Sequence, residues 1–290
     1  MKVKLITDST SQIPVEFAQA NNIALIEPLI QFEGDYRKEI SEVDREVFVS
    51  KMRNFDSFPL TTLASPQDAL DLFEQIIKEG YKEAIYLFLT PELSNQIAPV
   101  KIAYKKVKDK LNVHFYATGY AATSQAPFVL YAVKLFEEGK SSEEVMKLLD
   151  KLKTMVYTIG ISSSFDILFK SGKIKKSFKM SFISNLMRLK PLVEGLLDKG
   201  FAGFGAGSGY GGAIKKLKAA IEEKTDPKLD YNIILCHTKN EKLAQKLEAT
   251  AKDIRKVHTV DVWSISPCVA NTLGYGAAMV TLYPTLDSLK

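Results

Sequence analysis

The sequence is poor in cysteine and has no long apolar run. Only two cysteines, Cys236 and Cys268, occur among its 290 residues, which is too few for a disulfide framework and is typical of a reducing compartment. No apolar stretch approaches the roughly 18 residues that a membrane-spanning helix needs. The apolar start at Leu5 and Ile6 breaks at once into polar residues, unlike a cleavable signal peptide. We therefore expect a soluble, cytoplasmic protein without a transmembrane segment.

An excess of charge of one sign is also missing. The chain has 39 basic and 34 acidic residues, so its formal net charge is +5, and these charges are spread along the predicted helices. Such faces are ordinarily solvated surface, and we expect no nucleic-acid partner. With 46% hydrophobic residues, a chain of this length can bury two ordinary cores, which favours two domains.

The motifs of common enzyme classes are mostly absent. No lysine follows the glycines as in a phosphate-binding P-loop, and no G-x-S-x-G elbow occurs. The histidines His114, His237 and His258 are scattered, so we expect no metal site, and we interpret His237 as a hydrogen-bonded structural residue. No pair of acidic residues lies within the apolar runs, as a general acid and base would need. We therefore expect a protein with no catalytic residue and no cofactor.

One glycine-rich segment keeps an alternative open. The run from Gly207 to Gly212 fits G-x-G-x-x-G and precedes a predicted helix, but no clear buried strand leads into it. The alternative is an enzyme that binds a nucleotide phosphate between Gly203 and Gly212.

Apolar runs alternate with helical patterns through the first half of the chain. Strands are predicted at residues 5–7, 24–28, 84–89 and 113–117, and helices at residues 44–53, 65–78, 96–110, 124–138 and 142–154. This alternation is typical of βαβ units and a parallel sheet. In the second half, strands are predicted at residues 155–161, 231–236, 257–264 and 277–283, and helices at 213–223 and 241–254. The sequence predicts an α/β fold with an N-terminal parallel-sheet βαβ domain, residues 1–156, and a C-terminal mixed α/β domain, residues 157–290.

Side-chain hydroxyls gather where strands end and helices begin. Asp8, Ser9 and Thr10 follow the first strand, at the edge where open α/β sheets bind ligands. Further hydroxyls occur at Thr61, Thr62 and Ser94. Each could bind an anion, or could simply cap a helix or a turn. Ser65 before Pro66 is interpreted as such a cap, since proline is favoured at the first helical position.

Taken in order, these segments resemble the DegV family of bacterial fatty-acid-binding proteins. The opening run from Thr7 to Ser11 with Pro14 matches the first-strand motif of that family. Looser matches follow at residues 61–66, 93–95, 171–174 and 189–192. The resemblance spans nearly the whole chain in matching order. It implies a two-domain α/β protein that binds and sequesters a long-chain fatty acid and is itself not an enzyme.

The resemblance also implies a site and a partner. The N-terminal domain would carry the carboxylate site and the C-terminal domain would complete the acyl pocket. The implied carboxylate ligands, with possible support from Asp8, Ser9 and Thr10, are Thr61, Thr62, Ser94, Asn95 and Thr272. The implied partner is a fatty acid kinase, to which the protein would present its ligand.

Two departures from the family weaken the expectation of a kinase partner. Thr272 stands where the family has a histidine, and residues 205–209 are glycine-rich where the family has a basic segment. Positive charge that could meet an acidic partner is therefore reduced. A basic stretch at residues 170–179 could supply charge from another side.

Overall fold

A computed structural model of the chain describes residues 2–55, 57–172 and 188–289. Its helices are α1 (Val15–Ala20), α2 (Arg45–Lys51), α3 (Pro66–Lys78), α4 (Ile97–Tyr104), α5 (Ala126–Glu137), α6 (Ser142–Leu152), α7 (Phe165–Lys170), α8 (Gly209–Lys224), α9 (Glu241–Ile254), α10 (Pro267–Leu273) and α11 (Leu286–Leu289). Its strands are β1 (Lys4–Asp8), β2 (Ala24–Ile26), β3 (Leu29–Phe32), β4 (Asp35–Lys38), β5 (Thr61–Thr62), β6 (Glu83–Phe88), β7 (Asn112–Ala117), β8 (Tyr157–Ile161), β9 (Leu189–Leu196), β10 (Gly200–Ser208), β11 (Tyr231–His237), β12 (Val257–Ser264) and β13 (Ala278–Pro284).

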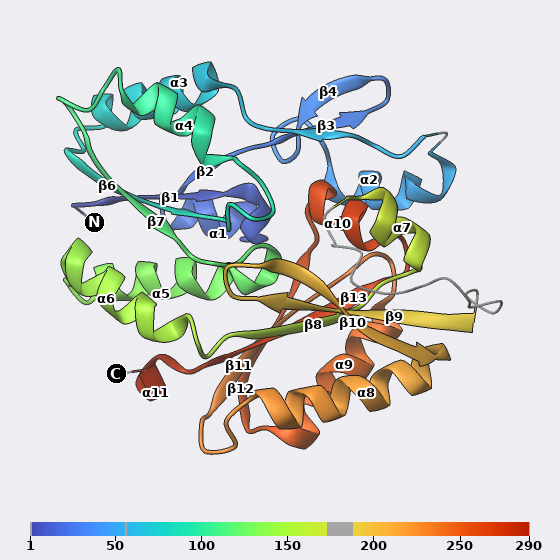
Figure 1. Ribbon diagram of the computed structural model, residues 1–290. Helices are drawn as coiled ribbons and strands as arrows, with labels where there is room; N and C mark the ends of the chain where they lie inside the picture. The colour runs from blue at the N-terminus through green and yellow to red at the C-terminus, as the bar shows by residue number, and fades with distance from the viewer. Residues whose placement is uncertain (1, 56, 173–187, 290) are drawn as a thin grey trace.

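The first sheet has four parallel strands in the order β2-β1-β6-β7. Helices α3 and α4 cover one face, and α1, α5 and α6 cover the other (Figure 1). Successive residues of a strand point to opposite faces, so Leu5 packs in the cluster with α5 whereas Ile6 packs in the cluster with α3. Both residues are fully buried, as is typical of parallel strands covered by helices on both sides.

The second sheet has six strands in the order β10-β9-β8-β13-β11-β12. Only β11 and β12 pair in parallel; the other neighbours are antiparallel. Helices α8 and α9 pack on one face of this sheet. Helix α5 lies between the two sheets (Figure 1), because its buried residues pack with Ile234 and Tyr283 as well as with the first sheet.

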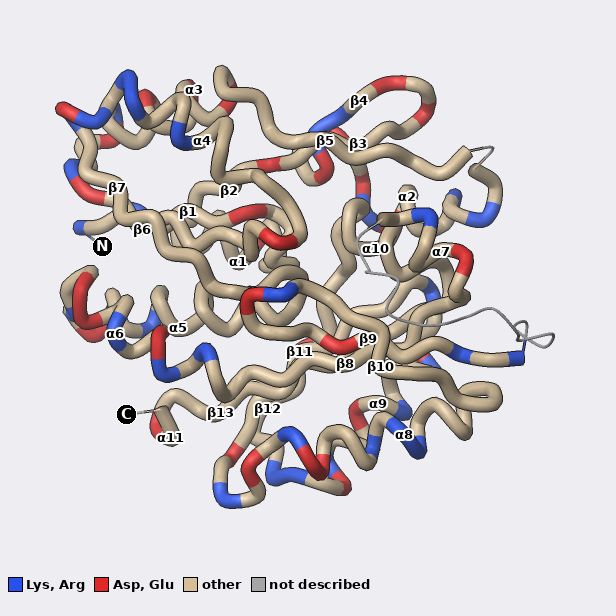
Figure 2. Tube along the Cα trace, in the orientation of Figure 1, with Lys and Arg blue, Asp and Glu red and all other residues tan. Residues whose placement is uncertain are grey.

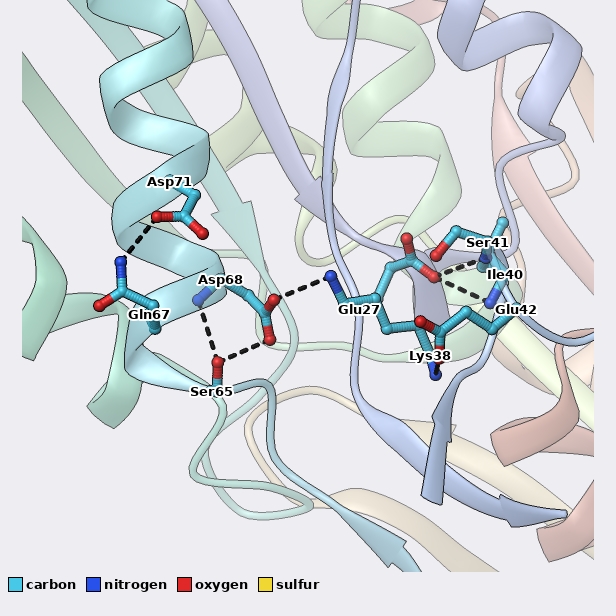
Figure 3. A network of polar contacts seen from close by, with 9 residues as sticks. All are labelled: Glu27, Lys38, Ile40, Ser41, Glu42, Ser65, Gln67, Asp68 and Asp71. Atoms are coloured by element: carbon cyan, nitrogen blue, oxygen red, sulfur yellow. Dashed lines mark hydrogen bonds and ion pairs between the residues drawn. The ribbon is translucent and has the colours of Figure 1, made fainter. Parts of the chain in front are cut away.

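A small antiparallel sheet, β4-β3-β5, comes from the N-terminal part of the chain but packs on the C-terminal part. Ile30 and Phe32 share a buried cluster with Ala270 and Met279. On its other side, Lys38 Nζ lies 2.8 Å from Asp68 Oδ1 at the start of α3 (Figure 3). The small sheet therefore bridges the two larger ones.

Side-chain oxygens that accept from backbone N–H groups hold the segment after β4 and the start of α3. Glu27 Oε2 accepts from the backbone N–H groups of Ile40 and Ser41, each at 2.9 Å (Figure 3). In the same view, Ser65 Oγ accepts from the backbone N–H of Asp68 at 3.0 Å, so Ser65 caps α3 as its sequence predicts.

The predicted fold class is confirmed: a parallel βαβ sheet is followed by a mixed α/β sheet. Helix α9 and strand β12 have the predicted bounds, whereas α4 ends at Tyr104 instead of residue 110. The sequence analysis did not predict β3, β4, β5, β9, β10, α7, α10 or α11. The domain boundary at residue 156 stays a prediction; the chain enters the second sheet at Tyr157.

Charged residues lie mainly on the outer helices and turns, and the strands of the two large sheets carry few of them (Figure 2). Within residues 2–55, 57–172 and 188–289, no helix combines the length and the apolar character that a bilayer crossing requires.

Candidate functional site

The strand order of the first sheet places a ligand crevice between β1 and β6. From β1 the chain adds β2 on one side, and it then returns to add β6 on the other. Ligands of doubly wound sheets bind at such a switch point, beyond the carboxyl ends of the strands. A cavity of about 440 Å³ opens there and reaches the second half of the chain, including Val193, Phe201 and Met279. Its size is within the range of small-molecule sites, roughly 300–1,000 Å³.

Most of the residues that line this cavity are apolar, and they come from both halves of the chain. The apolar lining residues are Pro28, Phe58, Pro59, Leu60, Leu63, Leu89, Leu93, Ala121, Ala122, Val193, Phe201, Cys268, Val269, Leu273 and Met279. Leu60 is 56% exposed, so the lining extends to the molecular surface there. Such a cavity suits an extended apolar ligand.

Predicted hydroxyl ligands from separate segments line the same cavity. Thr61 and Thr62 lie on β5, Ser94 lies in the turn between β6 and α4, and Thr272 lies on α10. Thr10 lies just after β1, and its Oγ1 is buried without a hydrogen-bond partner in the described part of the chain. The Thr272 hydroxyl donates to the Cys268 carbonyl at 3.1 Å, whereas a hydroxyl whose proton is not already donated can bind an acceptor-rich headgroup.

Asp8 also lines the cavity, from the carboxyl end of β1. One carboxylate oxygen accepts from the Tyr86 hydroxyl, and the other accepts from the backbone N–H of Leu89 at 2.7 Å. Gln125 Nε2 lies 3.5 Å from that second oxygen. Burial outweighs these hydrogen bonds and raises the pKa of Asp8 to about 7. Near neutral pH, many molecules therefore have a protonated Asp8. In these molecules the side chain places no negative charge beside a ligand.

Two of the predicted residues do not line this cavity. The Ser9 hydroxyl is buried and donates to Glu39 Oε1 at 2.6 Å, and Ser9 does not line the cavity. Asn95 is exposed and is likewise outside the cavity lining; its carbonyl accepts from the N–H of Ala98. Both residues are adjacent in sequence to lining residues, but neither lines the cavity itself.

Helix capping does not account for these polar residues. Neither Asp8 nor the Pro14 that precedes α1 makes a side-chain capping bond. The residue before α4 is Gln96, and it too makes no such bond. Among the hydroxyls considered, Ser65 alone is shown to cap a helix in the described residues. The anion-binding interpretation of Thr10 and Ser94 therefore keeps its structural basis.

Four polar lining residues were not predicted as ligands: Gln96, Lys170, Ser171 and Asn271. Gln96 lies two residues beyond Ser94 and is 2% exposed. Lys170, a basic residue at the end of α7, also lines the cavity. The rest of the basic stretch, residues 173–179, lies outside the described residues. An amide so close to Ser94 was visible in the sequence, but its burial was not.

The glycine-rich segment forms a strand and a helix start that differ from a dinucleotide site. Strand β10 leads directly into α8, but it is antiparallel to β9 and lies at the edge of the sheet. The dinucleotide fingerprint belongs instead to a parallel βαβ unit. Gly207 allows the backbone to approach α8, since an added Cβ would lie 1.9 Å from the backbone nitrogen of Ala213.

The remaining candidates for metal or thiol chemistry are structural. His237 Nδ1 accepts from the backbone N–H of Asn240 at 3.4 Å, as its structural interpretation predicts. Cys236 is fully buried, and burial raises the pKa of its thiol. In the part of the chain that the structure describes, no group of three or more His, Cys, Asp or Glu side chains could hold a metal ion.

Solved structures share this fold over nearly the whole chain. A DegV lipid-binding protein from Thermotoga maritima has a TM-score of 0.87 at 23% identity, covering 98% of this chain and 99% of its own. A fatty-acid-binding DegV family protein from Thermus thermophilus has a TM-score of 0.86 at 21% identity, covering 98% and 100%. A stearic acid-binding protein from Eubacterium ventriosum has a TM-score of 0.82 at 16% identity, covering 98% and 99%.

Sequence comparison agrees with the fold. A DegV domain-containing protein from Caldanaerobacter subterraneus is 24% identical over 260 residues, which cover 87% of this chain and 88% of that protein. Protein DegV from Bacillus subtilis is 25% identical over 256 residues, covering 87% and 89%. The family model described as "Uncharacterised protein, DegV family" matches residues 2–285. Because that match spans nearly the whole chain, the protein belongs to the DegV family.

Proposed function

We propose that this protein binds and sequesters a long-chain fatty acid, with the acyl chain in the apolar cavity and the carboxylate at the hydroxyls. The observation that carries the proposal is the lining itself. Thr10, Thr61, Ser94 and Thr272, from four separate segments, line one mostly apolar cavity. The similar proteins from Thermus thermophilus and Eubacterium ventriosum bind fatty acids, which supports the same ligand class.

The energetics favour an acyl ligand with a polar end. Burying an acyl chain of about 16 carbons yields on the order of 12 kcal/mol of gross transfer free energy, before the costs of ordering and association. Hydrogen bonds to a charged headgroup add roughly 1.5–3 kcal/mol each. The acyl chain therefore dominates the affinity, and the hydroxyls determine the orientation of the ligand in the cavity.

The first prediction is that protein purified from a bacterial host carries a fatty acid of about 16 to 18 carbons. An empty apolar cavity forfeits packing contacts, so it should fill from the host lipid pool. Native mass spectrometry before and after denaturation, with analysis of the solvent extract, detects the ligand. Folded protein that yields no acyl species and takes up no added palmitate or oleate would rule the proposal out.

The second prediction concerns the headgroup. Thr61→Ala and Ser94→Ala are each expected to weaken palmitate binding by roughly 1–3 kcal/mol without unfolding the protein, since each removes one donor to the carboxylate. The methyl ester of palmitate, which lacks the charge, should lose much less affinity. Ser50→Ala is a matched control, because this exposed hydroxyl only donates to the Glu46 carbonyl within α2. Unchanged palmitate affinity in both variants would contradict the headgroup assignment.

A fatty acid kinase as partner stays a prediction of the family resemblance. Two segments depart from the family and weaken the expectation of a kinase. Of these, residues 205–208 lie in the edge strand β10, and Thr272 lines the cavity. The proposal of ligand binding does not depend on that partner.

A further inference from the structure

Gln96 lines the cavity, and its amide nitrogen has no partner among the described residues. The residue is 2% exposed, and it lines the cavity beside Ser94. Its Nε2 is buried without a hydrogen-bond partner in the described residues. Leaving a buried donor unpaired has a desolvation cost. That cost is relieved if a ligand in the cavity brings an acceptor to this nitrogen.

The orientation of the amide is fixed by the backbone. Gln96 Oε1 accepts from the backbone N–H of Ala64 at 3.2 Å. With the amide reversed, Nε2 would face that N–H, donor against donor. The same bond joins the turn after β6 to the segment that follows β5, so it ties Ser94 to the neighbourhood of Thr62. Gln96 therefore has a fixed amide orientation and lines the same cavity as Ser94 and Thr62.

We propose that Gln96 is a specificity-determining residue, whose Nε2 donates to the ligand headgroup and selects a carboxylate over a terminal alcohol. This inference rests on the proposed function. A carboxylate offers only acceptors and suits an amide donor. The amide carries no charge and has no proton to lose near neutral pH, so its donor does not depend on the ionisation of Asp8, which lines the same cavity.

The test compares palmitate with hexadecanol in Gln96→Glu, at about pH 9 so that the new carboxylate is ionised. This change keeps an oxygen for the Ala64 N–H and turns the donor into an acceptor. Palmitate should bind at least about tenfold more weakly, whereas hexadecanol, whose hydroxyl can donate to the new carboxylate, should keep its affinity. A merely structural role would weaken both ligands equally, and that result would overturn the inference.

Two further variants keep the result interpretable. Gln19→Glu introduces the same charge change at an exposed position of α1, and it should leave the ratio of the two affinities unchanged. If Gln96→Glu does not fold, Gln96→Met replaces it, and the ratio should still fall, by severalfold. Wild-type protein that binds neither palmitate nor hexadecanol would defeat the proposed function; wild-type binding with an unchanged ratio in the Gln96 variants would defeat this inference alone.

Discussion

Replacing Asp8 by asparagine is expected to abolish a large pH-dependent component of folding stability. The carboxyl is fully buried, and its pKa rises from 3.8 to about 7, chiefly through desolvation. One pKa unit corresponds to about 1.4 kcal/mol, so ionising this group in the folded state costs about 4 kcal/mol. The folded state holds the proton more tightly than the unfolded state does. The contribution to stability is therefore fully present below about pH 3.8 and is lost as pH rises to about 7.

The measurement is urea unfolding of ligand-free protein between about pH 5 and pH 8. In the wild type, the free energy of unfolding should fall by roughly 2–3 kcal/mol across this interval; in Asp8→Asn, this fall should disappear. Asparagine can still accept from the Leu89 N–H, and it can donate to the Tyr86 hydroxyl oxygen. The slope against pH is therefore a cleaner readout than the absolute stability.

Asp68→Asn is the matched control for that experiment. Lys38 lowers the pKa of Asp68, with a smaller contribution from Ser65, so this carboxylate stays ionised throughout the interval and its removal should leave the slope unchanged. A wild-type stability that does not change between these pH values, or a slope that Asp8→Asn retains, would show that Asp8 is not the responsible group.

Replacing Gly207 by alanine is expected to destabilise the protein by about 3 kcal/mol, at the upper end of overpacking effects. An added Cβ would lie 1.9 Å from the nitrogen and 2.3 Å from the Cα of Ala213. Both are backbone atoms at the start of α8, so no side-chain rotation relieves the clash. The first turn of α8 would have to move away from β10.

Gly203→Ala provides the matched comparison, since it lies on the same strand with no atom within 4 Å of an added Cβ. Urea denaturation should place Gly203→Ala close to the wild type, with Gly207→Ala well below both. The glycine run would then have a packing explanation. Equal stability of the two variants would contradict it, and stabilisation of the wild type by a nucleotide would revive the alternative of a phosphate site.

Local patterns alone determined much of the fold. The alternation of apolar runs and helical periods predicted the parallel first sheet, and the predicted bounds of α9 and β12 agree with the structure because their apolar periodicity and ends are encoded within short stretches. Two missed elements also had local signals. Glu33 and Gly34 both adopt positive φ in the turn between β3 and β4, which is typical of a tight hairpin. Helix α10 begins with Ser266 and Pro267, the same pair that correctly marked the start of α3.

The tertiary structure alone decided which polar groups share the cavity. Asp8 acquires its raised pKa because α5, β6 and the segment after it exclude water, and no local pattern encodes that desolvation. Gln96 becomes a fixed donor through Ala64, 32 residues away in sequence. Ser9 matches the family motif and Asn95 replaces its glycine, yet neither residue lines the cavity. The sequence determined which residue types stand at strand ends, whereas long-range packing determined which of them a ligand can reach, because burial and direction depend on elements distant along the chain.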